Sequence, residues 1–145
     1  MTRFYDIDEA NAQLPEVSSI LSALRDQREE LIRLRDEALE RSESVEATAG
    51  DTGRSSGAES ASSDADTRVV RLRMQGIVDR MQAGVARLVE LSVTLRDIET
   101  GLIDFPALVN GRPIWLCWRL GEGDIEWWHE LSTGFSGRER LRDLT

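Results

Sequence analysis

The sequence predicts an α+β fold in which a long antiparallel helical hairpin packs against a C-terminal three-stranded antiparallel β-meander. Two observations predict the hairpin: apolar residues recur at steps of three and four in two long segments, and a Ser/Gly-rich segment separates them. A third observation predicts the sheet, because residues 102–131 contain strand-like runs separated by turn sequences. With 145 residues the chain has the length of a single domain, residues 1–145.

Residues 1–44 form the first predicted helical region. Asp6 lies three residues before Glu9, which suits the start of a short helix over Asp8–Leu14. Pro15 suits the first turn of a longer helix that continues to residue 44, because its missing N–H is not needed there. The apolar residues of this helix follow helical steps, and charged residues occupy its other face. They are Val17, Ile20, Leu21, Leu24, Leu31, Leu34 and Ala38.

Residues 45–67 differ in composition from both flanking segments. From Ala47 to Thr67 alanine is the only apolar residue, and serine, glycine and aspartate are abundant. Such a segment cannot bury enough apolar surface to offset the entropy lost on ordering. We therefore expect residues 45–67 to be a flexible loop that joins two helices.

Residues 67–101 form the second predicted helix and carry the strongest periodic signal in the chain. Its apolar stripe comprises Val70, Met74, Ile77, Met81, Val85, Leu88, Leu91, Leu95 and Ile98. Gly76 and Gly84 lie near one face and allow another helix to approach closely, and Gly101 suits the position after a helix end. Two amphipathic helices of similar length predict an antiparallel hairpin, whose apolar stripes need a further packing partner.

Residues 102–131 supply that partner as a β-meander, and residues 132–145 form a C-terminal tail. The predicted strands are Leu102–Val109, Arg112–Leu120 and Ile125–Leu131. The dipeptide Asn110-Gly111 predicts a two-residue turn between the first two strands. That turn places Asp104 opposite Cys117.

The second turn decides which side chains share a face of the sheet. A turn centred on Glu122-Gly123 pairs Cys117 with Trp128, whereas a bulged three-residue turn places Cys117 opposite His129. The first pairing separates apolar from polar positions more cleanly, and we therefore expect it. It places His129 on the apolar face that lies on the helices.

The opposite face of the sheet carries more apolar side chains than a solvated face needs. In the expected register Trp115, Cys117 and Trp128 lie there among charged residues. We infer a second contact surface on this face, either a subunit interface or a shallow binding site. The two tryptophans, together with Gly76 and Gly84 on the second helix, predict the interface of a homodimer.

His129 is the only histidine and the centre of the candidate ligand-binding site. Glu99 and Asp104 flank the predicted junction between helix and sheet, where they can approach it. A histidine with two carboxylates suits a metal site or a general acid–base pair, although a lone histidine on an apolar face is usually a hydrogen-bonded core residue. Residues 134–138 are Gly-rich and predict an anion-binding loop that includes Arg138. The candidate ligand-binding residues are Glu99, Asp104, Arg119, His129, Glu130 and Arg138.

Composition argues against several classes of protein. The chain has 18 arginines, no lysine and 27 acidic residues, and its net charge of −9 argues against nucleic-acid binding. No apolar run is long enough to span a membrane, and residues 1–8 lack the apolar segment of a signal peptide, so we expect a cytoplasmic protein. Cys117 is the only cysteine, which excludes an internal disulfide. Its expected neighbours, Asp104 and Trp128, do not favour a nucleophilic thiolate.

Several sequence blocks resemble one family. They are Phe4–Pro15, Asp97–Ala107, Cys117–Glu122, Trp128–Glu130 and Gly134–Arg138. Together they resemble the small prokaryotic family named domain of unknown function 2203, over both helices and the C-terminal sheet, while the Ser/Gly-rich segment resembles an insertion. The resemblance implies no activity. It does imply that certain polar residues belong to motif blocks: Glu99, Asp104, Arg119, Glu122, His129, Glu130 and Arg138.

The sequence predicts, first, a non-catalytic structural or interaction protein that acts as a homodimer or binds an unidentified protein partner. The alternative is a small-ligand or metal-binding domain, or an enzyme, with a site around Glu99, Asp104, Arg119, His129 and Glu130. Convergence of those side chains in one pocket would favour the alternative, and separate salt bridges would favour the first hypothesis. The sequence assigns no catalytic residue, metal or cofactor.

Overall fold

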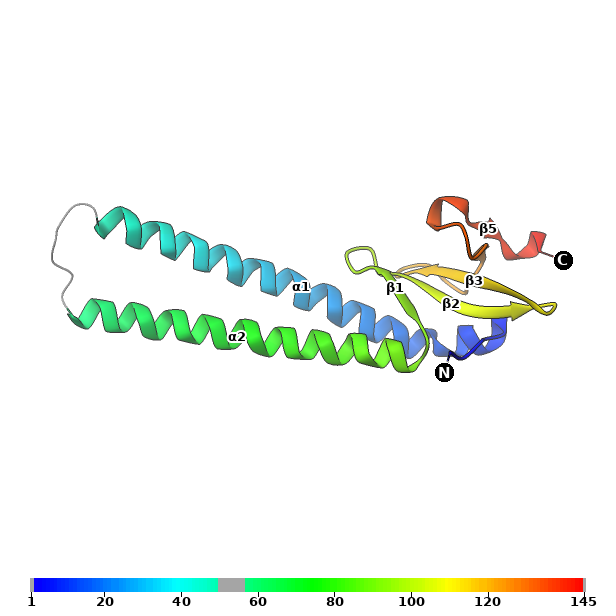
Figure 1. The fold of residues 1–145 in the computed structure, drawn as a ribbon, viewed down its shortest axis with the longest axis horizontal. Helices are drawn as coiled ribbons and strands as arrows, with labels where there is room; N and C mark the ends of the chain where they lie inside the picture. The colour runs from blue at the N-terminus through cyan, green and yellow to red at the C-terminus, as the bar shows by residue number, and fades with distance from the viewer. Residues whose placement is uncertain (1, 50–56, 145) are drawn as a thin grey trace. The chain divides into compact units, whose positions relative to one another are not determined.

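The computed structural model describes residues 2–49 and 57–144 and has an α+β fold (Figure 1). A helical hairpin packs against an antiparallel sheet, which confirms the predicted class, and the sheet has five strands instead of three. The helices are α1, Ile7–Ala49, and α2, Gly57–Glu90. The strands, in sheet order, are β1 Thr94–Asp97, β2 Leu102–Val109, β3 Arg112–Arg119, β4 Trp127–His129 and β5 Glu139–Arg140. The short 3₁₀ helices η1, Phe135–Gly137, and η2, Leu141–Asp143, flank β5.

The chain forms two compact units. The first consists of Met1–Arg25 and Gln82–Thr145, and it contains the sheet and the adjoining ends of both helices. The second unit, Asp26–Met81, contains the remaining parts of α1 and α2. Its core is a small cluster of Leu34, Val70 and Ile77, with Leu31, Ala38, Met74 and Met81 partly buried around it.

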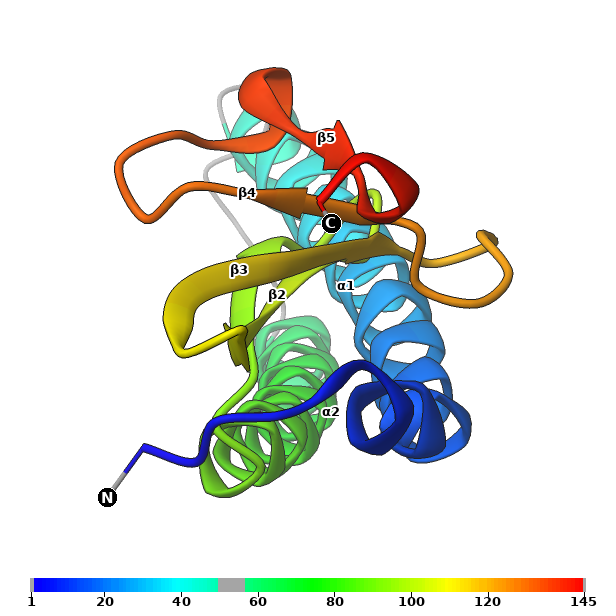
Figure 2. The ribbon, with the colours of Figure 1, turned by 90° about the vertical axis from the view of Figure 1, so that its right-hand side faces the viewer.

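Tyr5 joins the N-terminal segment to the sheet and to the end of α2 within the first unit. Its N–H donates to the Pro106 carbonyl at 2.8 Å, and its hydroxyl donates to the Leu91 carbonyl at 2.5 Å. Its ring meets Phe105 edge-on, with the ring centroids 5.3 Å apart. Figure 2 shows this N-terminal segment crossing α2 before α1 begins. The face of β2 that carries Phe105 therefore belongs to the apolar core, whose other members include Val17, Leu21, Leu24, Leu88, Ile103, Ile114 and Leu116.

The predicted helix start at Asp6 is confirmed, but the helix continues through Pro15 without a break. The Asp6 carboxylate caps it by accepting a hydrogen bond from the Glu9 N–H at 2.7 Å. Pro15 lies inside α1 instead of starting a separate helix. A proline there removes one backbone hydrogen bond. Leu14 and Val17 are buried on either side of it, and their packing holds the helix in place.

The predicted loop over residues 45–67 is helical at both of its ends. α1 extends to Ala49 and α2 starts at Gly57, while residues 50–56 lie outside the described residues. The prediction considered only the burial of apolar surface. However, an existing helix gains one hydrogen bond for each residue added to it, and alanine favours the helical conformation even where it packs against no core.

The second helix ends at Glu90, not at residue 101. Ser92 adopts a positive φ of 59°, and its N–H donates to the Val89 carbonyl, which closes the helix end. The stripe residues Leu95 and Ile98 therefore do not belong to a helix. Leu95 lies on β1 and pairs with Ile103 of β2, so apolar residues at helical spacing serve here as a strand.

Of the two strand registers that the predicted turns imply, one is confirmed and the other is wrong. The β2–β3 register is confirmed, with Asp104 opposite Cys117. In the β3–β4 pair, Cys117 lies opposite Trp127, so both pairings considered from the sequence are wrong. As a result Trp128 lies beside Leu116 in the core, and the predicted placement of His129 on the apolar face is also wrong.

A tertiary contact explains this shift of register. The Ile125 N–H donates to the side-chain oxygen of Asn11 in α1 at 2.8 Å. The Trp118 ring N–H donates to the Gly123 carbonyl, also at 2.8 Å. Residues 120–126 therefore form a wide loop anchored to α1, and a turn pattern read from local sequence cannot give its register.

Candidate functional site

Three polar side chains from adjacent strands meet on the face of the sheet opposite Phe105 and Leu116. They are Asp104 from β2, Cys117 from β3 and His129 from β4, and we call them the Asp–Cys–His cluster. One carboxylate oxygen, the thiol sulfur and one imidazole nitrogen all lie within 4.8 Å of one another. The three residues are only 1–2% exposed. A buried cluster of this composition offers oxygen, sulfur and nitrogen ligands to a single point.

Both ring nitrogens of His129 face hydrogen-bond acceptors. Nδ1 lies 2.8 Å from the Glu130 carbonyl oxygen, and Nε2 lies 3.0 Å from an oxygen of the Asp104 carboxylate. A neutral imidazole donates from one nitrogen only. The geometry is therefore satisfied by a ring that carries both protons, or by one that donates from Nδ1 while a cation replaces the proton at Nε2.

The two oxygens of Asp104 have different surroundings. Oδ2 accepts a hydrogen bond from the Arg96 Nε–H at 2.8 Å and also faces His129. Oδ1 is buried, and no donor among the described residues lies within hydrogen-bond distance of it. Leaving a buried acceptor unpaired costs about 1–3 kcal/mol. This oxygen is thus free to accept a ligand.

Cys117 is poorly suited to nucleophilic chemistry. Burial, reinforced by the nearby negative charge of Asp104, raises the pKa of its thiol to about 11, against a smaller opposing effect of Arg138. The thiol is therefore protonated at neutral pH. His129 cannot take its proton, because both of its ring nitrogens already face other groups. The cluster does not have the arrangement of a cysteine–histidine catalytic pair.

Arginines and tryptophans surround the Asp–Cys–His cluster. The Arg96 guanidinium lies 5.1 Å from the ring centroid of Trp115, and that of Arg138 lies 4.3 Å from that of Trp127. Arg138 also contacts the Cys117 thiol and forms two hydrogen bonds with the Glu122 carboxylate, both at 3.2 Å. These contacts hold the arginines at the cluster and orient their charges.

The structure brings together only part of the predicted ligand-binding set. Asp104 and His129 meet, on the face of the sheet opposite the one expected for His129. Glu99 is exposed in the turn between β1 and β2, and Glu130 pairs with Arg112. Arg119 is exposed over the Phe135 ring, 5.7 Å from its centroid. Arg138 reaches the site through Cys117.

Sequence reasoning missed Cys117 and Arg96 as members of the site. The confirmed Asn110-Gly111 turn already placed Cys117 opposite Asp104, so the signal for one of them was present. Arg96 fell within the predicted second helix, and no pattern indicated that it belongs to an edge strand.

The residues predicted at an interface occupy different environments. Trp128 is 5% exposed, and the Arg112 guanidinium lies 5.4 Å from its ring centroid, so this tryptophan belongs to the core. Trp115 is half-buried on the face that carries His129. A Cβ at Gly84 would lie 3.3 Å from Leu24 Cδ2, so this glycine lets α1 and α2 approach closely within the chain.

Gly76→Ala is expected to stabilise the protein by about 0.5–1 kcal/mol, because alanine has the higher helix propensity and glycine the larger entropy cost. A Cβ at Gly76 meets nothing within 4 Å. Urea unfolding followed by circular dichroism measures the change. Gly84→Ala is the matched comparison and should gain less, because its Cβ must displace Leu24. A loss of stability at Gly76 would indicate that another molecule packs against this glycine.

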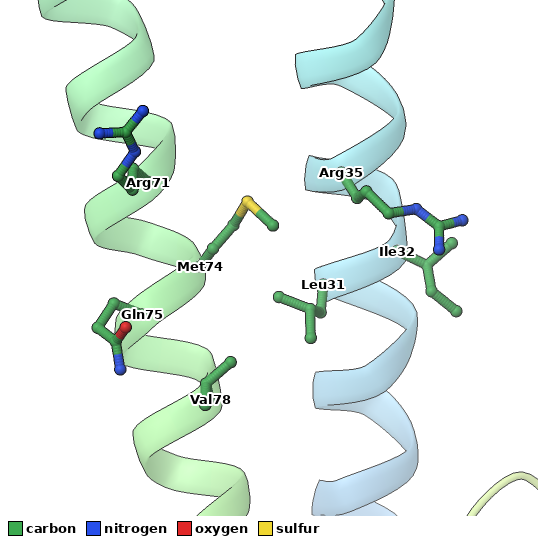
Figure 3. A pocket seen from close by; sticks show the side chains of 7 residues that line it. All are labelled: Leu31, Ile32, Arg35, Arg71, Met74, Gln75 and Val78. Atoms are coloured by element: carbon green, nitrogen blue, oxygen red, sulfur yellow. The ribbon is translucent and has the colours of Figure 1, made fainter.

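A cleft between the two helices is the second candidate site, and it lies entirely within Asp26–Met81. It has a volume of about 400 Å³. Figure 3 shows Leu31 and Met74 pointing toward each other across it. The lining consists of Leu31, Ile32, Arg35, Arg71, Met74, Gln75 and Val78. Its floor is apolar, and two arginines stand at its edge.

The fold and these sites define a small α+β protein with a helical hairpin and a buried polar cluster on its sheet. The chain belongs to the DUF2203 family of uncharacterised conserved proteins, whose family model matches residues 3–141. No curated protein and no solved structure is significantly similar to it. Among the described residues, no helix has the length and hydropathy needed to cross a membrane.

Proposed function

We propose that the protein is an interaction module that acts as a homodimer through its helical hairpin. The observation that carries this proposal is the thin core of the second unit. Among its described side chains, those of residues 26–42 and 64–81, only Leu34, Val70 and Ile77 are buried. Two helices bury only the narrow seam between them, and a bundle of three or four helices is needed to cover wider apolar stripes.

Apolar side chains beside that seam remain in contact with solvent. Leu39 is 56% exposed and lies seven residues after Ile32, so both occupy one face of α1. Ile32 lines the cleft together with Val78 of α2. An apolar cleft continued by an exposed leucine is a surface that a further helix would cover.

The charge pattern of the hairpin favours a second copy of the chain as the partner. Residues 26–40 of α1 contain six acidic residues and three arginines, whereas residues 68–81 of α2 contain four arginines and one aspartate. A dimer that sets α2 of one copy against α1 of the other brings opposite charges together. This steers association despite the net charge of −9 on each chain.

The divergence of the predicted ligand-binding residues also supports this proposal. Glu130 pairs with Arg112, and Glu99 and Arg119 are exposed. These residues therefore do not converge on one pocket with Asp104 and His129, as the alternative of an enzyme or ligand-binding domain would require.

Light scattering after size-exclusion chromatography at micromolar concentration should give about twice the chain mass of 16.3 kDa. Leu39→Arg should raise the dimer dissociation constant at least tenfold, because it places a charge in the apolar contact and opposite the arginines of the partner's α2.

Val69→Arg is the control for this variant. Val69 is 50% exposed and lies two residues before Arg71 and five before Met74, so it faces away from the cleft that these residues line. Its replacement should leave the dimer intact. A wild-type protein that stays monomeric over the whole range, or equal weakening by both variants, would contradict the proposal.

A further inference from the structure

We infer that Asp104, Cys117 and His129 together bind one divalent transition-metal ion of the zinc class. The inference is independent of the proposed dimer, because all three ligands come from the sheet of one chain. It rests on the placement of the ligand atoms, on an unpaired carboxylate oxygen and on the contacts that orient the histidine.

The placement suits a single ion. Bond lengths of about 2.0–2.3 Å in a tetrahedral site put the ligand atoms roughly 3–4 Å apart. One ligand atom from each of the three residues lies within 4.8 Å of the other two, and Asp104 Oδ2 lies 3.0 Å from His129 Nε2. Small side-chain rotations on a rigid sheet therefore suffice to bring all three to one ion.

The unpaired oxygen of Asp104 points to a missing ligand. Oδ1 is buried in a residue that is 2% exposed and has no hydrogen-bond partner among the described residues. Its other oxygen is held by Arg96, which fixes the carboxylate. A cation that binds the carboxylate through Oδ1 as well as Oδ2 would supply the missing interaction and thereby remove the cost of burying Oδ1 unpaired.

The contacts of His129 and Cys117 are those of metal ligands. Donation from Nδ1–H to the Glu130 carbonyl would leave the Nε2 lone pair directed at the carboxylate, which is the usual way in which proteins orient a metal-binding imidazole. Arg138, held by Glu122, lies near Cys117, and its positive charge favours the thiolate. When the metal–sulfur bond forms, the thiol proton leaves to solvent.

The ligand types select the class of metal. Thiolate and imidazole favour Zn²⁺, Co²⁺ and Fe²⁺, whereas Mg²⁺ and Ca²⁺ require oxygen ligands. Three protein ligands leave one tetrahedral position for water or another small ligand. The site would therefore bind a thiophilic ion and keep one exchangeable position.

Cobalt titration of the full-length, tag-free chain tests the inference. After removal of metals with EDTA, added Co²⁺ should bind at one ion per chain and produce a thiolate-to-cobalt charge-transfer band in the near ultraviolet. Zn²⁺ should abolish that band by competition and raise the melting temperature, and Mg²⁺ should do neither. Absence of the band from the folded wild-type protein would overturn the inference without any variant.

Variants then identify the ligands. Cys117→Ser should remove the charge-transfer band, and Asp104→Asn should weaken Co²⁺ binding at least tenfold. Glu99→Gln is the control for Asp104→Asn, because Glu99 is exposed in the turn between β1 and β2. A band that survives Cys117→Ser, or equal weakening by Glu99→Gln, would contradict the assignment of the ligands.

Discussion

Phe105→Ala is expected to lower the free energy of unfolding by about 3–5 kcal/mol, the range for truncating a buried phenylalanine. Phe105 is fully buried in the middle of β2. Its ring meets Tyr5 edge-on at 79°, so the substitution also removes an aromatic pair that links the N-terminal segment to the sheet. The cavity would open where that segment, the sheet and the end of α2 meet.

Urea unfolding followed by tryptophan fluorescence measures this effect, since all four tryptophans lie between residues 115 and 128. Leu108→Ala is the control on the same strand. Leu108 is 47% exposed, and its truncation should cost less than about 1 kcal/mol. Similar losses in the two variants would mean that Phe105 does not hold the core together.

Sequence periodicity predicted that the two helices exist but not where they end. Apolar steps of three and four identified both helices, because this spacing places apolar side chains on one face of a helix. They did not locate the helix ends. The end of α2 depends on the positive φ of Ser92 and on the pairing of Leu95 with Ile103, and both are consequences of the tertiary fold.

In the sheet, one strand register follows from local sequence and another involves a tertiary contact. The turn at Asn110-Gly111 has φ angles of 55° and 76°, which asparagine and glycine adopt readily, so its register could be derived from two residues. The register of β4 depends on Asn11, more than a hundred residues away in sequence. No local pattern contains that contact.

An error of one residue in that register changed the whole candidate site. It placed His129 on the apolar face, although the structure places it beside Asp104 and Cys117. The approach of Asp104 to His129 was considered from its position near the predicted helix–sheet junction, as an alternative to a hydrogen-bonded core histidine. Cys117 was left out of the predicted ligand-binding set because its chemistry was weighed only as that of a nucleophile, although the structure places its thiol beside a carboxylate and an imidazole.

Gly101→Ala is the second substitution for which a large effect is expected, a loss of about 2–5 kcal/mol. Gly101 has a φ of 69°, and an added Cβ would lie 2.6 Å from the Cβ of Leu120. The left-handed conformation costs alanine about 1–2 kcal/mol, and forcing apart two closely packed groups costs about 1–3 kcal/mol. The Gly101 carbonyl also accepts a hydrogen bond from the Leu120 N–H at 3.0 Å, so the backbone cannot move away without losing it.

Gly111→Ala separates the two causes. Gly111 has a similar φ of 76°, but a Cβ there meets nothing within 4 Å, so only the conformational cost of about 1–2 kcal/mol should appear. The difference in unfolding free energy between the two variants then measures the clash with Leu120. Equal losses would mean that Leu120 moves aside at no cost, and that close packing of Gly101 against β3 contributes nothing to the stability of the sheet.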